Sequence, residues 1–338
     1  LIGQIEDGSL DLPQTAGQTI TFFAGEEIRV DNATAINTQG GSLSFTGTQG
    51  VTVGSVNARG GDVSFSSDEA ITTFGTVETA GGTVSYAIAG GDRTARLGNV
   101  EASDFVFDLD GLDLSGNLIG LGELDLTGVD TISVSGADTG ATIGAIDGTD
   151  TFDITLDPGV TITGPGGLRF IGRNVALPAI DGLSRLEVTA TGILTLTGDI
   201  RTDNSAGGLG GNVDLREAES VVLGADIRID TDRIGTDPAG DVLLDGPSIP
   251  STTSRLTIDT NTDAGNDTGE AFGLISLGDA NVGSLTLFGG PVELRGNVIV
   301  RERLDLGRVE AVRVEGDARI DTQGADLSFG DNGIDGPG

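Results

Sequence analysis

The sequence predicts an all-β protein, a right-handed parallel β-helix (β-solenoid) with three short strands in each turn of about 20 residues. Three observations lead to this prediction. A Gly-Gly-x-[Leu/Val]-Ser-[Phe/Tyr] motif recurs near the start of the chain. Apolar residues come in alternating, strand-like pairs along most of its length. Runs with apolar residues at i, i+3, i+4 and i+7, which are typical of amphipathic helices, are lacking.

The motif sets the period of the repeat. Its three near-copies occupy residues 40–45, 60–65 and 81–86, and similar apolar pairs lie on either side. The period stays near 20 throughout this part of the chain, where the pairs begin at Ile20, Leu43, Val63, Val84, Phe105 and Leu124. We expect each pair to lie on its counterpart one turn later, with Leu43, Val63 and Val84 in one column and Phe45, Phe65 and Tyr86 in the next.

A finer spacing divides each period into three strands. Leu186/Val188 leads after eight residues to Leu194/Leu196 and after six more to Ile200. The same spacing begins at Val63, Val213 and Leu304. Each strand has two inward positions separated by one outward position, which is too little apolar surface to fold alone, so consecutive turns must stack. Gly-Gly pairs suit the sharp corners between strands, and the crossover rule favours right-handed winding.

One continuous solenoid over residues 1–338, with about 15 turns, follows from this count. Two stretches are less regular, at 138–184 and 230–275, and we expect them to carry loops that protrude from one corner. The alternative fold is an antiparallel sandwich or barrel. That fold requires hairpin turns, and the Asn-Gly and Asp-Gly signals for such turns are sporadic here.

Composition excludes several classes of function. The 338 residues include 52 acidic and 18 basic side chains, all Arg, for a net charge of −34, and there is no Cys or His. Disulfides, thiolate or imidazole metal sites and Ser–His nucleophiles are therefore excluded. So strong a negative charge argues against nucleic-acid binding, and no apolar run is long enough to span a membrane. We interpret the chain, which opens with Leu-Ile-Gly-Gln, as a mature or excised segment of an acidic secreted protein.

The repeats resemble those of filamentous-haemagglutinin-like bacterial exoproteins. The resemblance is carried by the period near 20, by the Gly-Gly corners and by segments such as 186–200, Leu-Glu-Val-Thr-Ala-Thr-Gly-Ile-Leu-Thr-Leu-Thr-Gly-Asp-Ile. It implies a large secreted protein, often exported by two-partner secretion, whose β-helix forms the shaft of an adhesin or fibre at the bacterial cell surface or in the matrix. The Asn-Pro-Asn-Gly signature of that family's secretion domain is missing, so the resemblance implies a shaft segment.

The strongest local motif is a twelve-residue acidic loop at 259–270. It matches the calcium-loop pattern at positions 1, 3, 5, 9 and 12, although Ala264 stands where that loop has Gly. Alternating Asp and Asn side chains supply the oxygen ligands that a hard cation prefers. A solvated polar loop is the other interpretation. The predicted calcium ligands are Asp259, Asn261, Asp263, Asp267 and Glu270.

Acidic runs that could perform sugar chemistry are also present. Acid–base hydrolysis of glycans needs two carboxylates at a controlled separation. The runs are Asp108, Asp110 and Asp113, then Asp226, Asp230 and Asp232. The segment Asp230-Thr231-Asp232, together with Asp237 and Asp241, is also a weaker version of the calcium motif. With so many acids such neighbours arise by chance, and Trp, Lys and His, which glycan-active sites often use, are missing.

The sequence therefore favours a non-enzymatic structural protein over two alternatives. One alternative is a polysaccharide-degrading β-helix enzyme, and the other is a carbohydrate-binding adhesive module that holds a surface glycan in the loops. Residues 36–45 and 320–329 share seven of ten identities, so the two ends carry the same kind of turn. We expect the ends to stack head to tail on copies of the same chain, or to continue into flanking parts of a longer solenoid.

Overall fold

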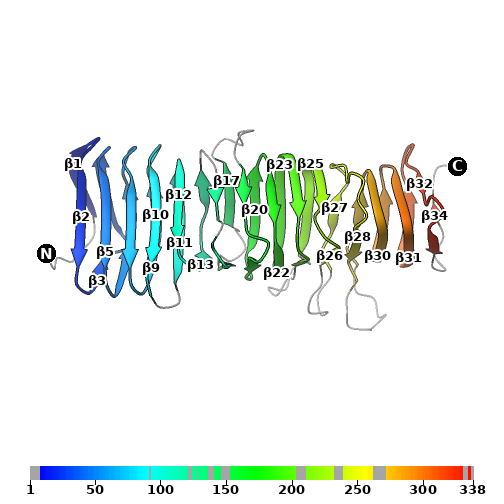
Figure 1. Ribbon diagram of the computed structural model, residues 1–338, viewed down its shortest axis with the longest axis horizontal. Helices are drawn as coiled ribbons and strands as arrows, with labels where there is room; N and C mark the ends of the chain where they lie inside the picture. The colour runs from blue at the N-terminus through cyan, green and yellow to red at the C-terminus, as the bar shows by residue number, and fades with distance from the viewer. Residues whose placement is uncertain are drawn as a thin grey trace. The chain divides into compact units, whose positions relative to one another are not determined.

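The computed structural model describes residues 8–90, 93–120, 124–126, 128–135, 141–145, 153–202, 211–231, 239–261, 272–329 and 334–335. In these residues the regular secondary structure is all β-strand, and the strands pair in parallel as a β-solenoid (Figure 1). The predicted fold class is thus confirmed. No helix in the described ranges is long and apolar enough to cross a membrane.

The chain divides into two compact units. Unit 1 comprises Leu1–Gly136 and Ala141–Val160, and unit 2 comprises Ala137–Gly140 and Thr161–Gly338. The solenoid has about 13 turns of roughly 20 residues. This is fewer than the expected count of about 15, because several turns in unit 2 are lengthened by insertions.

Unit 1 has three strands in each turn, and each strand pairs in parallel with its equivalent in a neighbouring turn. Face A consists of β2 (Thr19–Ala24), β5 (Ser42–Gly47), β8 (Val63–Ser67), β10 (Thr83–Ile88) and β12 (Asp104–Asp108). Face B consists of β3 (Glu27–Arg29), β6 (Gly50–Val53), the first halves of β9 (Ile71–Glu78) and β11 (Thr94–Ala102), β13 (Gly111–Leu114) and β16 (Thr131–Val134). Face C consists of β1 (Gly8–Thr15), β4 (Thr34–Gln39), β7 (Ser55–Asn57), the second halves of β9 and β11, β14 (Leu118–Gly120) and β17 (Ala141–Ala145). A further pair is β15 (Leu124–Asp125) with β18 (Ile154–Thr155).

The core of unit 1 contains a ladder of stacked aromatic rings. Phe45 pairs in register with Phe65, and Phe65 with Tyr86, as the sequence predicts. Ring centroids in these pairs are 5.2 and 5.1 Å apart, with interplanar angles of 11° and 12°. Phe22 and Phe107 extend the ladder at 4.9 and 5.9 Å. Stacking one ring on the next buries apolar area turn after turn, so each turn stabilises its neighbours.

Unit 2 also has three faces, each again a parallel ladder. Face D consists of β20 (Gly167–Gly172), the first parts of β23 (Arg185–Leu196) and β25 (Asn212–Leu223), β27 (Val242–Leu244), β29 (Ile275–Leu277), the last parts of β30 (Ala280–Leu294) and β31 (Val298–Val314), and β34 (Ile334–Asp335). Face E consists of β21 (Val175–Leu177), the second parts of β23 and β25, a bridge at Ile249, the first parts of β30 and β31, and β32 (Ile320–Asp321). Face F consists of β19 (Thr161–Thr163), β22 (Ala179–Leu183), β24 (Ile200–Thr202), β26 (Ile227–Asp230), β28 (Arg255–Asp259), the middle of β30 and β31, and β33 (Asp326–Phe329).

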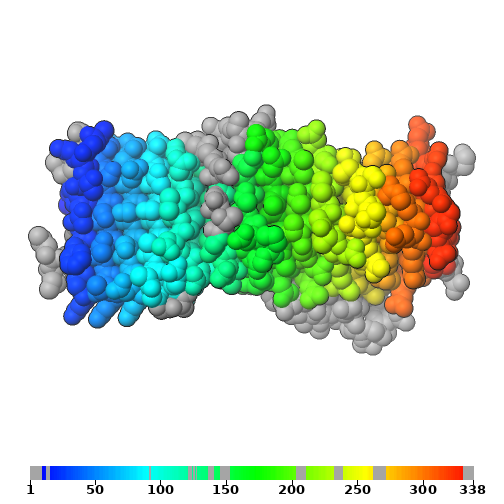
Figure 2. Space-filling view, viewed as in Figure 1, coloured from blue at the N-terminus to red at the C-terminus, as the bar shows by residue number. Residues whose placement is uncertain are grey.

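The turns of unit 2 vary in length. On face D, Leu186 pairs with Val213, Val213 with Val242, and Val242 with Ile275, so the interval grows at each step. It then shortens, since Ile275 pairs with Val292. The core is mainly aliphatic and equally well buried, with Leu186, Val213 and Val242 each 0% exposed. In Figure 2 the turns of each unit follow one another as successive bands of colour. Each turn contacts mainly the turns on either side.

Spacing alone did not identify the face on which a strand lies. The eight-then-six spacing begins both at Leu186 and at Leu304. Leu186 lies on face D, whereas Leu304 pairs with Leu285 and Leu327 on face F. The turns of unit 2 differ in length. The same spacing of apolar residues therefore begins on face D in one turn and on face F in another.

Candidate functional site

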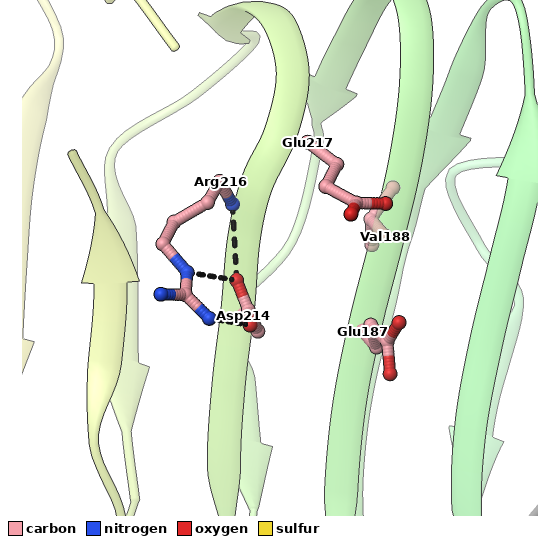
Figure 3. Close-up of a pocket in the computed structure, with 5 residues that line it drawn as sticks. All are labelled: Glu187, Val188, Asp214, Arg216 and Glu217. Atoms are coloured by element: carbon pink, nitrogen blue, oxygen red, sulfur yellow. Dashed lines mark hydrogen bonds and ion pairs between the residues drawn. The ribbon is translucent and has the colours of Figure 1, made fainter. Parts of the chain in front are cut away.

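A shallow hollow on face D brings acidic and basic side chains together (Figure 3). It has a volume of about 260 Å³ and is lined by Glu187, Val188, Asp214, Arg216 and Glu217. Parallel pairing of β23 with β25 places Glu187 beside Asp214. Since outward side chains of neighbouring turns stand side by side, three carboxylates from two strands reach one patch.

Arg216 folds back onto Asp214 within the same strand (Figure 3). Its Nη2 donates to Asp214 Oδ2 at 2.7 Å, its Nε donates to Oδ1 at 3.0 Å, and its backbone N–H donates to Oδ1 at 3.1 Å. Partial burial acts to raise the pKa of Asp214, but the hydrogen bonds from Arg216 outweigh burial and hold the pKa below its ordinary value. Asp214 is therefore ionised at neutral pH and is poorly suited to donate a proton.

Arg169, from the preceding turn, ties the two glutamates into the same network. Its Nε lies 2.9 Å from Glu187 Oε1, and its Nη2 lies 3.8 Å from Glu217 Oε2. The Thr189 hydroxyl donates to Glu217 Oε2 at 2.6 Å. The hollow thus combines cationic donors with carboxylate acceptors, a set that can hydrogen-bond the hydroxyl groups of a glycan.

The first acidic run forms ion pairs in unit 1. Arg93 donates to Asp108 Oδ1 at 2.8 Å and to Asp110 Oδ1 at 2.9 Å. Asp113 pairs with Arg96, which stands opposite it on the neighbouring strand, at 3.3 Å. These carboxylates link the chain to Arg side chains of the preceding turn.

The second acidic run is similarly engaged. Asp226 Oδ1 accepts the backbone N–H of Arg255 at 2.8 Å, and Asp230 lies 3.1 Å from Arg228 Nη2. Asp241 Oδ1 accepts the backbone N–H of Leu274 at 2.8 Å. The other two acids of this group, Asp232 and Asp237, lie outside the described residues.

Of the five predicted calcium ligands, the structure describes Asp259 and Asn261. Asp259 Oδ2 accepts from Arg228 Nη2 at 2.8 Å, and its Oδ1 accepts the backbone N–H of Asn261 at 3.1 Å. The remaining three, Asp263, Asp267 and Glu270, lie outside the described residues. Within the described ranges no group of three or more acidic side chains is placed to hold a metal ion. The calcium site stays a prediction.

A set of threonine hydrogen bonds, which the sequence did not predict, joins the two ends of each of three insertions. Thr231 Oγ1 donates to Gly240 O at 2.7 Å, and Thr260 Oγ1 donates to Gly273 O at 2.9 Å. Thr202 donates to Gly211 O in the same way. These threonines are at most 1% exposed and lie at the ends of face F strands in three successive turns, so each insertion starts and ends at the same corner.

The same clamp closes the short corners of unit 1. Thr38 Oγ1 donates to Gly41 O, and Thr79 Oγ1 donates to Gly82 O, both at 2.8 Å. The recurring Thr-x-Gly-Gly at 38–41 and 79–82 is the sequence signal that identifies it. In unit 2 the insertion separates the Thr from its Gly, which conceals the signal.

Asn and Asp side chains at the strand starts form another set of contacts between turns. Asn99 Oδ1 accepts the backbone N–H of Asn117 at 2.9 Å, and Asn117 Oδ1 accepts that of Thr142 at 2.9 Å. Asp199 and Asp279 accept the backbone N–H groups of Arg228 and Asn297 in the same manner. Many polar side chains of this chain therefore hold neighbouring turns together.

Comparison with protein-family models, with curated proteins and with solved structures gave no match.

Proposed function

We propose that this chain is a non-enzymatic structural β-solenoid that forms part of the shaft of a secreted bacterial fibre or adhesin. The observation that carries the proposal is the use of the charged side chains. Arg–carboxylate pairs occur on all three faces of unit 2: Arg169–Glu187 on face D, Arg319–Asp321 on face E and Arg303–Asp305 on face F. Such a distribution suits a uniform, hydrated surface, whereas a catalytic site concentrates its charges on one face.

The mechanism in this proposal is mechanical. Within each unit, each turn is joined to the next by parallel ladders of main-chain hydrogen bonds and by an apolar core, which together resist bending and stretching. A net charge of −34 keeps the surface hydrated and opposes lateral clumping.

A decisive experiment compares structure with activity. Electron microscopy of the native material should show fibres that contain this chain. The purified chain, incubated with neutral and acidic polysaccharides, should release no new reducing ends and no unsaturated sugars. If the chain released either product and the variant Asp214→Asn did not, the shaft proposal would be wrong. The chain would then be a polysaccharide-degrading enzyme.

Carbohydrate binding at the hollow on face D is the second candidate function. The combination of Arg169, Glu187 and Asp214 around a surface depression favours it. Glycan-array binding that is lost in Glu187→Gln, and kept in the matched exposed variant Glu310→Gln, would establish this role.

Calcium binding at residues 259–270 belongs to the same proposal. Because a ligand that binds the native state stabilises it, calcium should raise the melting temperature of the chain. The double variant Asp263→Ala/Glu270→Ala should lose that increase. A wild-type melting curve that does not change at millimolar calcium would leave a solvated loop.

A further inference from the structure

The aromatic ladder of unit 1 contains one phenol among phenyl rings. Its rings are Phe22, Phe45, Phe65, Tyr86 and Phe107, and Tyr86 is the only Tyr in the chain. The Tyr86 side chain is fully buried, and burial raises the pKa of its hydroxyl, which therefore stays protonated. A phenyl ring would stack equally well at this position. The buried hydroxyl is the feature that packing does not explain, because such a group needs a hydrogen-bond partner.

A column on face B contains one hydroxyl among aliphatic side chains. Thr73 pairs in register with Val53 of the preceding turn and with Leu97 of the next turn. Leu97 in turn pairs with Leu114, and all four side chains are at most 1% exposed. Burial alternates along the first part of β9, so Thr73 points into the core as its neighbours in the column do. Each of the two columns thus carries one polar side chain, and the two side chains belong to consecutive turns.

The fold directs these two hydroxyls at one another. The first half of β9 lies on face B and its second half on face C, so Thr73 lies at the corner between these faces. Because three faces enclose the core, a ring that points inward from the middle of face A is aimed at this corner. The Thr73 hydroxyl comes close enough to Tyr86 to offset in part the effect of burial on the pKa of the phenol.

We propose that the hydroxyls of Tyr86 and Thr73 bind one another across the core and act as a registration key, which fixes how the turns of unit 1 stack. Within the described residues neither oxygen completes a hydrogen bond of good geometry with any group. Each hydroxyl can both donate and accept, and its hydrogen rotates freely, so a small shift of either side chain completes the bond between them. The key thereby satisfies two buried polar groups at once.

Unit 1 needs such a key because its repeats are alike. If the turn that contains β8 and β9 looped out, β10 would pair directly with β5, and Tyr86 would stack on Phe45. Apolar side chains would still meet apolar side chains, so hydrophobic burial discriminates weakly between the two registers. The Tyr86 hydroxyl would then face Val53, which occupies in its turn the position that Thr73 holds in the next. A buried hydroxyl without a partner is unfavourable, so the key selects the native register.

The first test moves the phenol and keeps the amino-acid composition. Phe65→Tyr together with Tyr86→Phe places the phenol one turn earlier, opposite Val53 instead of Thr73. This twofold swap should melt at a lower temperature than wild type, because its two hydroxyls no longer meet. Adding Val53→Thr and Thr73→Val moves the partner by one turn as well. The resulting fourfold swap should recover most of the lost melting temperature, although all three proteins contain the same amino acids.

The second test detects a skipped turn directly. The chain has no Cys, so introduced thiols are unique. Ser44 and Ser85 pair with Ser64 from opposite sides, which leaves them about 9.6 Å apart and beyond the reach of a disulfide. In the skipped register they would be neighbours. The intramolecular cross-link of Ser44→Cys/Ser85→Cys, formed by mild oxidation during refolding from urea, therefore reports the skipped turn. Ser64→Cys/Ser85→Cys is the matched control, since it reports the native register.

The cross-links should respond to the key in opposite ways. With Tyr86 and Thr73 in place, the 44–85 link should be rare. With Tyr86→Phe and Thr73→Val, it should become about five-fold more frequent, which is the factor that one hydrogen bond of typical strength represents. The control link should form readily in both backgrounds.

Three results would overturn the key. They are a twofold swap that melts as wild type does, a fourfold swap that is no more stable than the twofold swap, and a 44–85 link that is equally frequent with and without the two hydroxyls. Circular dichroism of each variant checks that it is folded. A twofold swap that fails to fold agrees with the key, and the fourfold swap then decides. The key concerns how unit 1 folds, so its outcome is independent of the proposed shaft function.

Discussion

Unit 1 and unit 2 both stack successive turns, but they differ in turn length, in the composition of their cores and in how their corners are closed. Unit 1 keeps a nearly constant period on face A and has five stacked aromatic rings in its core. Unit 2 has turns of unequal length, an aliphatic core and insertions closed by buried threonines. The comparison shows that register between turns depends on the strands and corner clamps, because chain length between them can vary without disturbing the core.

The largest loss of stability is expected when the aromatic ladder of unit 1 is interrupted. Phe65 is 1% exposed and stacks between two rings, so Phe65→Asp removes both contacts and buries an unpaired charge. Loss of the ring alone typically costs about 3–5 kcal/mol. Hydrogen exchange should show several turns of unit 1 unfolded. The control Phe23→Asp, at a 70% exposed position, should change stability by less than about 0.5 kcal/mol.

A smaller loss of stability is expected at the corner near Gly289, where the turns of unit 2 become short again. Gly289 has a φ of +111°, and a Cβ there would lie 2.5 Å from the backbone carbon of Thr260. Gly289→Ala should therefore lower the free energy of unfolding by roughly 1–3 kcal/mol. Gly159→Ala, where nothing lies within 4 Å, is the control. Equal melting temperatures for the two variants would contradict the close approach.

The threonine clamp at the insertions should contribute less to the free energy of unfolding than Gly289 does. Thr231→Val removes the hydrogen bond to Gly240 and leaves that carbonyl without its hydroxyl donor, so we expect a loss of about 1–2 kcal/mol in urea unfolding. Thr231→Ser should restore most of it. Replacing residues 232–239 with Gln-Gly, which converts this corner to the form seen in unit 1, should leave the fold intact. Unfolding of that shortened chain would show that the insertion itself holds the turns in register.

The smallest effect is expected at Asp214. Its pKa is lowered in the folded chain, so its contribution to stability is present above the unfolded value near 4 and is lost as pH falls through the lower folded value. Melting temperatures of wild type and Asp214→Asn should differ at pH 7 and converge at strongly acidic pH. A constant difference across this range would contradict the ion pair with Arg216.

The sequence by itself determined the fold and much of the register. Alternating apolar pairs at a period near 20 can be buried only by stacking, so the columns Leu43–Val63–Val84 and Phe45–Phe65–Tyr86 followed from spacing. It also identified Asp259 and Asp230 as residues worth attention, since acidic residues in short runs are visible in one dimension.

Only the tertiary structure decided what those residues contact and on which face each strand lies. Asp259 meets Arg228 from the preceding turn of face F, and Thr231 meets Gly240 across an insertion of unrelated sequence. Such pairings depend on how many residues each turn contains, a quantity that varies in unit 2 and moved Leu304 to a different face from Leu186. Spacing within a strand is local and can be read from the sequence, whereas the length of a turn is known only once its corners are located in space.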